Sequence, residues 1–198
     1  MEMEQGFVPY GRRFEEALLY AARVHAVQSR KGSGVPYITH LLAVAAIIGE
    51  SGGTEDEVIA ALLHDAVEDQ GGAPRLADIR ARFGERVAAI VWGCTDATTI
   101  PKPPWRARKE AYIAHLAKAT PSVLLVSSAD KLHNARAILA DLRVLGPTLW
   151  DRFTGGQAGT LWYYRALVEA YAARGGGAVA EEFGRVVAAI ERIAAQPT

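Results

Sequence analysis

Four ionisable residues lie close together in the stretch ALLHDAVEDQ at 61–70. His64 stands four positions before Glu68, and Asp65 stands four positions before Asp69. Residues four apart on a helix are neighbours, about 5 to 6 Å between Cβ atoms, so all four side chains would share one narrow strip. Three carboxylates beside an imidazole repel one another unless a cation is present. The spacing therefore predicts chemistry rather than packing.

A second histidine and a second acid could complete a metal site. His40 lies in PYITHLLAV, near the start of a predicted helix, where its imidazole could face inward. Asp130 lies in SSADKLHNARAI, just after an apolar stretch that should be buried, and a buried carboxylate without a partner is expensive. Two imidazoles and two carboxylates suit Mn²⁺, Fe²⁺, Zn²⁺ or Ni²⁺ better than Ca²⁺ or Mg²⁺. The predicted ligands are His40, His64, Asp65 and Asp130.

Each of these residues, taken alone, also has a structural explanation. A single His-Asp pair is common by chance, Asp130 could be a helix cap or an ion-pair partner, and His40 could be an interfacial histidine. Glu68 and Asp69 could be solvated residues at a helix C-terminus, although acids there oppose the helix dipole. The occurrence of all these residues in one chain favours a metal site over the separate structural explanations. The other histidines are interpreted as structural or as supporting the site: His25, His115 and His133.

The composition favours one soluble domain over residues 1–198 and a small anionic partner. Lys plus Arg and Asp plus Glu number 22 each, so the chain lacks the basic field that binding to polymeric nucleic acid or an anionic membrane usually requires. The longest apolar run, 41–48, is far short of the roughly 20 residues that span a bilayer. The N-terminus begins acidic without an apolar signal segment, and the single cysteine, Cys94, fits a reducing compartment. We therefore expect a cytoplasmic protein.

The elements that must position these residues are helical throughout. Apolar residues recur at helical spacing, and a capping box of Thr54 and Glu57 predicts the start of the helix that carries the acidic strip. Only VLLVSS at 123–128 is equally compatible with a strand. The predicted helices cover 14–28, 36–48, 54–70, 75–83, 85–93, 105–119, 122–144, 157–173 and 178–194.

The order and spacing of four motifs resemble the hydrolase domain of the RelA/SpoT-homologue proteins, members of the HD superfamily. These motifs are HAVQSRKGSGVPYITHLLAVA, AALLHDAVED, CTDATTIPK and SADKLHNARAI. The resemblance covers about residues 12–145, and residues 146–198 are similar to the C-terminal helices of bacterial small HD proteins, so we expect them to complete the same domain. With no synthetase or regulatory domain following, the chain is similar to a stand-alone small alarmone hydrolase.

The resemblance implies a fold and a set of site residues. The fold would be an all-α HD-domain helical bundle in a single domain. Its metal ligands would be His40, His64, Asp65 and Asp130, holding one Mn²⁺ per chain. Its other site residues would be Glu68 and Asp69 for activation of water, Arg30 and Lys31 at the nucleobase, and Asn134 at the ribose. Basic residues near the proline-rich loop could hold the polyphosphate, or form a solvated face: Lys102, Arg106, Arg108 and Lys109.

The implied reaction is removal of pyrophosphate from the 3′ position of guanosine tetra- or pentaphosphate, the alarmones of the stringent response. A divalent ion can lower the pKa of a bound water from about 15.7 toward roughly 7 and polarise a phosphoryl oxygen. Glu68 could then take the proton of the attacking water while Asp69 orients it.

Other functions stay open from the sequence alone. Longer family members often carry a hydroxyl residue where this chain has Ala137, which leaves the same chemistry on adenosine 3′-pyrophosphates, (p)ppApp, as the alternative. Another HD-type nucleotidase or phosphatase is a further alternative. A non-catalytic nucleotide-binding module is disfavoured because a binder needs neither Glu68 nor Asp69.

Overall fold

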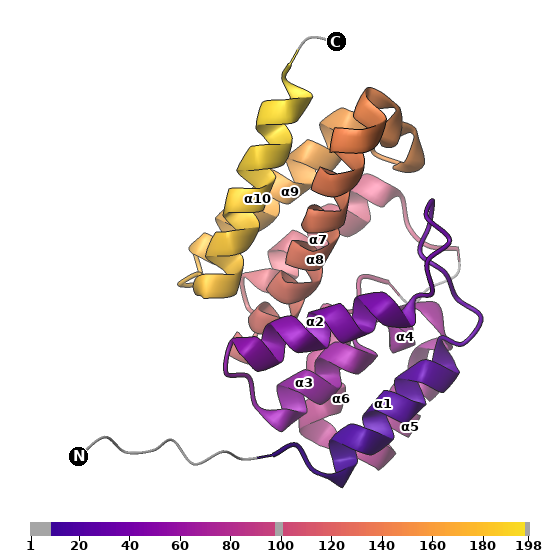
Figure 1. Cartoon of the computed structure of the whole chain (residues 1–198). Helices are drawn as coiled ribbons and strands as arrows, with labels where there is room; N and C mark the ends of the chain where they lie inside the picture. Colours follow the sequence, from indigo (N-terminus) through magenta and orange to yellow (C-terminus); the bar gives the residue numbers. More distant parts are fainter. Residues whose placement is uncertain (1–8, 98–100, 197–198) are drawn as a thin grey trace.

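The long helix α8 (Pro121–Leu145) joins two groups of helices and contacts elements of both (Figure 1). Thr120 caps it by accepting a hydrogen bond from the Val123 amide, and proline suits its first turn. The stretch 123–128, whose sequence is compatible with either a strand or a helix, lies inside α8. This computed structural model describes residues 9–97 and 101–196, and within them the fold is all-α.

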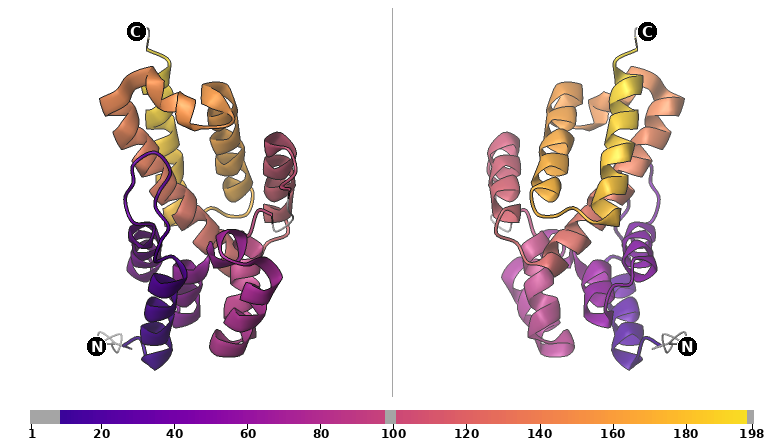
Figure 2. Two further views of the ribbon diagram at one scale, coloured as in Figure 1. Left: turned by 90° about the vertical axis from the view of Figure 1, so that its right-hand side faces the viewer. Right: turned by 90° about the vertical axis from the view of Figure 1, so that its left-hand side faces the viewer.

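The first group lies around the beginning of α8, whereas the second group lies alongside the rest of that helix (Figure 2). The first group comprises α1 (Arg12–Val24), α2 (Ile38–Glu50), α3 (Glu55–Leu63), α4 (Ala66–Asp69), α5 (Gly72–Phe83) and α6 (Glu85–Cys94). The second comprises α7 (Trp105–Leu116), the 3₁₀ helix η1 (Gly146–Arg152), α9 (Gly156–Ala172) and α10 (Ala178–Ala194). Helix α10 packs along α8. That residues 146–198 complete the same domain stays a prediction.

Helix α3 is the centre of the first group. Its residues 58–63 are all buried, and it packs against α1, α2, α6 and α8. A helix that is apolar all round lies in a core, so the polar residues that directly follow it are delivered to the protein interior. The predicted capping box at its start is confirmed, because the Thr54 amide donates to Glu57 Oε2 at 2.8 Å. The chain thereby brings His64 to the junction with α8.

The prediction of one unbroken helix over 54–70 is wrong. Helix α3 ends at Leu63, and the short α4 begins at Ala66. The His64 ring approaches the Ala61 carbonyl, with Nδ1 2.8 Å from the oxygen. In an uninterrupted helix that carbonyl would accept the amide of Asp65. The side chain takes over the bond, and the helix is interrupted where the acidic strip begins.

The predicted helix over 14–28 also ends early, at Val24. The following segment folds into a narrow loop instead. The Arg30 amide donates to the Val35 carbonyl at 2.8 Å, and the Tyr37 amide donates to the Gln28 carbonyl at 2.9 Å. Gly32 has φ +86°, a conformation that side chains with a Cβ rarely adopt.

The other predicted helices agree with the structure to within a few residues. The 3₁₀ helix η1 was not predicted; it begins at Gly146, which ends α8 and has φ +59°. In the described part of the chain, every helix is too short or too polar for a membrane span.

Candidate metal centre and adjoining pocket

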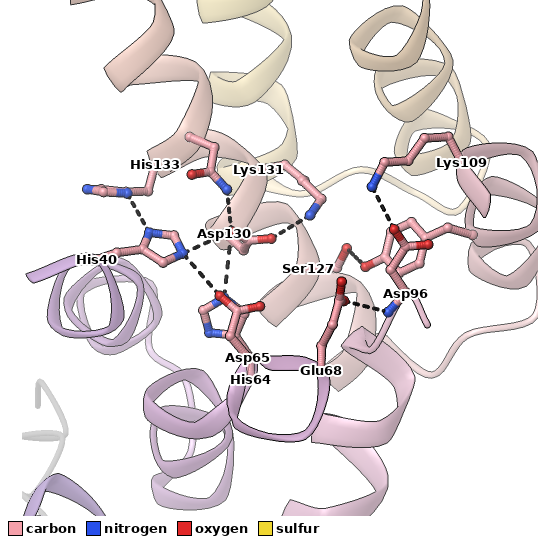
Figure 3. A network of polar contacts seen from close by, with 12 residues as sticks. His40, His64, Asp65, Glu68, Asp96, Lys109, Ser127, Asp130, Lys131 and His133 are labelled. Carbon is pink, nitrogen blue, oxygen red and sulfur yellow. Dashed lines mark hydrogen bonds and ion pairs between the residues drawn. The ribbon is translucent and has the colours of Figure 1, made fainter. Parts of the chain in front are cut away.

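Two imidazoles and two carboxylates converge where α8 meets α2 and the end of α3 (Figure 3). The Nε2 atom of His40 lies 3.2 Å from Asp130 Oδ1 and 3.7 Å from Asp65 Oδ2. The Nε2 atom of His64 lies 3.0 Å from Asp65 Oδ2 and 3.6 Å from Asp130 Oδ1. The structure therefore brings together all four residues that the sequence predicted as ligands.

Neighbouring groups aim these side chains at one another. The contact of His64 Nδ1 with the Ala61 carbonyl requires a hydrogen on Nδ1, which turns Nε2 toward the cluster. On the other imidazole, His40 Nδ1 lies 2.7 Å from His133 Nδ1. The Tyr37 hydroxyl donates to the Asp65 carboxylate at 2.5 Å. Such outer contacts are typical of metal-binding histidines and carboxylates, because they fix ring orientation and ligand geometry.

One buried nitrogen in the cluster has no hydrogen-bond partner. His64 Nε2 is enclosed, and its short distance to Asp65 lacks the alignment of a hydrogen bond. Buried polar atoms are almost always paired, so this nitrogen lacks a partner that a divalent ion would supply. The ligand atoms of His40, His64 and Asp65 lie within 4.8 Å of one another, as a shared ion would require. The donor set fits an ion of the Mn²⁺ to Zn²⁺ series.

Opposite charges lie close together in the cluster and shift the pKa values of Asp65 and His64. Burial opposes ionisation of Asp65, but the charge of His64 and the closeness of both imidazoles outweigh it and hold the pKa of this carboxyl well below its ordinary value. Burial likewise disfavours a charged His64, but Asp65 and Asp130 raise the pKa of its imidazole well above the ordinary value. In the metal-free site, a proton on His64 therefore balances the carboxylates.

A chain of hydrogen bonds runs from the cluster along α8. Asp130 accepts from Lys131 Nζ on one oxygen and from Asn134 Nδ2 on the other, both at 2.6 Å. The Asn134 side-chain oxygen in turn accepts from Arg30 Nη2 at 2.9 Å. Three residues that the sequence placed in separate roles are thereby joined into one path from the cluster to the loop after α1.

The two acids of α4 lie one turn beyond the cluster and make other contacts. Glu68 pairs with Lys102 Nζ at 2.8 Å and accepts the Asp96 amide at 3.0 Å. Asp69 accepts from Gln28 Nε2 at 2.8 Å. Burial, followed by the nearby charge of Asp65, raises the pKa of Asp69 above its ordinary value. Both carboxylates belong to the short helix that begins directly after Asp65.

The predicted basic group divides into separate contacts. Asp96 Oδ2 holds Arg108 at 2.6 Å and Lys109 at 2.7 Å, whereas Arg106 lies over the ring of Trp162, 3.2 Å from its centroid. Asp96 was not among the site residues predicted from the sequence. The signal was an acid within CTDATTIPK shortly before a basic helix; residues 98–100 of that motif lie outside the described residues.

A pocket of about 620 Å³ opens beside the cluster. Its wall near the cluster carries Lys131, His133 and Asn134, and the loop after α1 contributes Arg30 and Lys31. The three predicted base and ribose residues therefore line it together. Glu68, Asp69 and Lys102 are not among its lining residues. Lys131 was also not predicted as a site residue. The available signal was its position directly after Asp130, a predicted ligand.

Comparison with known proteins gives a consistent set of relatives. The HD domain family matches residues 17–146. The guanosine-3′,5′-bis(diphosphate) 3′-pyrophosphohydrolase MESH1 of Mus musculus is 39% identical over 139 residues, which is 69% of this chain and 73% of that protein. The bifunctional (p)ppGpp synthase/hydrolase SpoT of Escherichia coli K12 is 35% identical over 133 residues, which is 64% of this chain but 18% of SpoT.

A solved structure extends the likeness over nearly the whole chain. It is described as a metazoan ortholog of SpoT that hydrolyzes ppGpp, and it superposes with a TM-score of 0.75 at 30% sequence identity. The match covers 91% of this chain and 96% of the other. The likeness therefore includes the C-terminal helices beyond the family match.

Proposed function

Because the chain belongs to the HD domain family, we propose that it is a metal-dependent 3′-pyrophosphohydrolase of guanosine tetra- and pentaphosphate. The relatives described above carry this activity in their names. The observation that carries the proposal is the convergence of two imidazoles and two carboxylates beside a pocket lined by Arg30 and Asn134.

In this proposal the cluster holds one Mn²⁺ through His40, His64, Asp65 and Asp130. When bound, such an ion lowers the pKa of water and polarises a phosphoryl oxygen. The bond between phosphorus and the ribose 3′ oxygen breaks, and water gives its oxygen to the departing pyrophosphate and a proton to the 3′ hydroxyl. The product from the tetraphosphate is GDP.

The acids of α4 would handle the protons of this reaction. We assign Glu68 as the base that takes the water's proton and Asp69 as the group that orients the water. The ion pair with Glu68 places the Lys102 ammonium beside the proposed base, where it can also meet the polyphosphate. Burial and the charge of Asp65 raise the pKa of Asp69 above its ordinary value, so this carboxyl holds a proton more readily than an exposed aspartate.

The pocket would hold the nucleoside. Arg30 presents a planar guanidinium that can stack on a purine face, and Lys31 can donate to a ring acceptor. Asn134 contacts the ribose in this proposal and is held by Arg30 at 2.9 Å. The partner is thus a small nucleotide, and we assign the protein to the cytoplasm, as its single cysteine suggested.

The test is incubation of the purified chain with guanosine tetraphosphate and Mn²⁺, with products separated by anion-exchange chromatography. We expect GDP and pyrophosphate in equal amounts. The chelated protein and the Glu68→Gln variant serve as controls, and adenosine 3′-pyrophosphate is run beside them. Failure of the metal-replete protein to release pyrophosphate from either nucleotide would refute the proposal.

A further inference from the structure

A second charged pair lies at the end of the pocket remote from the metal cluster. Asp141 on α8 pairs through Oδ2 with Arg152 Nη1 of η1 at 3.1 Å, and both residues line the pocket. The two side chains are 47% and 33% exposed. Exposed ion pairs of this kind contribute little to stability, so a purely structural account leaves the presence of a carboxylate in the pocket unexplained.

Helix α8 sets the distance between this pair and the cluster. Asn134, Ala137 and Asp141 follow Asp130 by 4, 7 and 11 positions, which return to the same face of an α-helix. At 1.5 Å per residue, Asp141 lies about 16 Å along the helix axis from Asp130. Asn134, the proposed ribose contact, lies between Asp130 and Asp141 on this face and lines the pocket with Asp141. A nucleoside bound with its 3′-pyrophosphate at the cluster and its ribose at Asn134 would therefore point its base toward Asp141.

Resting on the proposed function, we propose that Asp141 selects guanine by reading the edge of the base. Guanine presents two donors side by side, N1–H and the N2 amino group. An ionised carboxylate only accepts hydrogen bonds and has enough lone pairs to receive both donors while keeping its contact with Arg152. Adenine presents the lone pair of its own N1 at that place, which a carboxylate repels. Attraction to one base and repulsion of the other act together.

Arg152 fixes the position of the carboxylate relative to the loop that carries Arg30. A Cβ built on Gly32 would lie 2.9 Å from Arg152 Cδ, so the arginine stem packs directly on the backbone of that loop. The same arginine holds Asp141 across the pocket. Arg152 thereby holds two parts of the pocket at a set separation. One is the loop of Arg30, proposed to stack on the face of the base, and the other is Asp141, proposed to read its edge.

The experiment compares kcat/KM for guanosine, inosine and adenosine 3′-pyrophosphates in the wild type, Asp141→Asn and Asp141→Ala. Asp151→Asn is the matched control, because it makes the same change at an exposed aspartate of η1 that does not line the pocket. For the wild type we expect guanosine first, inosine second since it lacks the N2 amino group, and adenosine last.

The asparagine variant gives the sharpest outcome. Its amide can donate to adenine N1, whose lone pair the carboxylate repels, while it can accept only one of the two guanine donors. We expect Asp141→Asn to lower guanosine kcat/KM by about 10- to 100-fold and to raise the adenosine value, with an unchanged melting temperature. A guanosine-to-adenosine ratio that stays within about twofold of wild type in both Asp141 variants would overturn the inference.

Failure of the proposed function is distinguishable from failure of this inference. If the wild type hydrolyses none of the three nucleotides, the hydrolase assignment fails. Binding of the same nucleotides to the metal-free protein, measured by calorimetry, then still reports whether Asp141 selects the base. If guanosine 3′-pyrophosphate is hydrolysed and both Asp141 variants keep the wild-type ratio, the hydrolase assignment holds and Asp141 is excluded as the selecting residue.

Discussion

The two ends of the pocket are built differently. At the metal cluster, His40 and His64 are buried, and each is fixed on its far side by a second contact. At the opposite end, Asp141 and Arg152 are half exposed and meet through a single ion pair. Loss of a buried ligand disturbs the interior, whereas a change at the exposed pair leaves the core intact.

This difference indicates how the chemistry and the choice of substrate are separated in the molecule. The cluster depends on groups delivered by α2, α3 and α8, so its geometry is tied to the fold. The far end depends on a loop, on η1 and on the last turns of α8. We therefore expect substitutions there to alter the preferred base at little cost in stability, and substitutions at the cluster to remove the reaction itself.

The largest expected effect follows removal of a proposed ligand. His40→Ala or Asp130→Ala should abolish bound Mn²⁺, measured by elemental analysis, and with it all activity, while circular dichroism shows the helical content largely retained. Asp130→Ala should be the less stable of the two, since it leaves the Lys131 ammonium, whose side chain is 17% exposed, without its partner, a loss of about 3 kcal/mol.

The matched control for this change lies on the same helix. Asp141→Ala removes the same side chain from the other end of the pocket and should keep the metal. An Asp130→Ala variant that stays active and metal-replete would exclude the proposed cluster.

The next effect separates proton transfer from metal binding. Glu68→Gln keeps the shape of the side chain and its contact with the Asp96 amide but removes the base. We expect kcat to fall by about 10² to 10⁴ while the metal content and KM change little. Normal turnover in Glu68→Gln would show that Glu68 is not the base, and the same measurement on Asp69→Asn would then test the neighbouring acid.

Most of the fold could be predicted from the sequence, because helical periodicity and capping signals are local. The errors have local causes that periodicity does not contain. The helix over 54–70 is interrupted by a bond between the His64 ring and a backbone carbonyl, and the helix over 14–28 ends where the backbone pairs across a loop. Both exceptions lie at the site, where local preference gives way to function.

Only part of the candidate site could be predicted, because the sequence contains local signals but not tertiary contacts. The proposed ligands are of types that are costly to bury without a partner, so spacing and burial indicated them. Asp141 is an ordinary exposed acid on a helix, and only the structure shows that it faces the pocket and meets Arg152. Ala137 left guanine recognition open in the sequence, and the residue one turn later on α8 now offers an answer.

A smaller effect concerns the pH dependence of metal uptake. The raised pKa of His64 means that its imidazole carries a proton at neutral pH in the metal-free site, and a metal binds only the neutral ring. Mn²⁺ binding should therefore release about one proton, and the affinity should rise with pH, up to the pKa of His64, by about tenfold per unit. Calorimetry in two buffers of different ionisation enthalpy measures the release. Binding without proton release would contradict the proposed balance of charge.

The smallest expected effect distinguishes the face of the base from its edge. In the proposed function, Arg30 would stack on a purine through its guanidinium plane, and this contact does not depend on the groups at the ring edge. Arg30→Ala should therefore lower kcat/KM for guanosine and adenosine 3′-pyrophosphates by a similar factor, about 2- to 30-fold. The ratio between the two substrates should stay at the wild-type value, in contrast to Asp141→Asn, which changes the ratio. Arg30→Lys keeps the charge without the plane, so it should recover little of the loss. If Arg30→Ala instead abolished the guanine preference, the arginine itself, or the Asn134 amide that it holds at 2.9 Å, would be the group that reads the base.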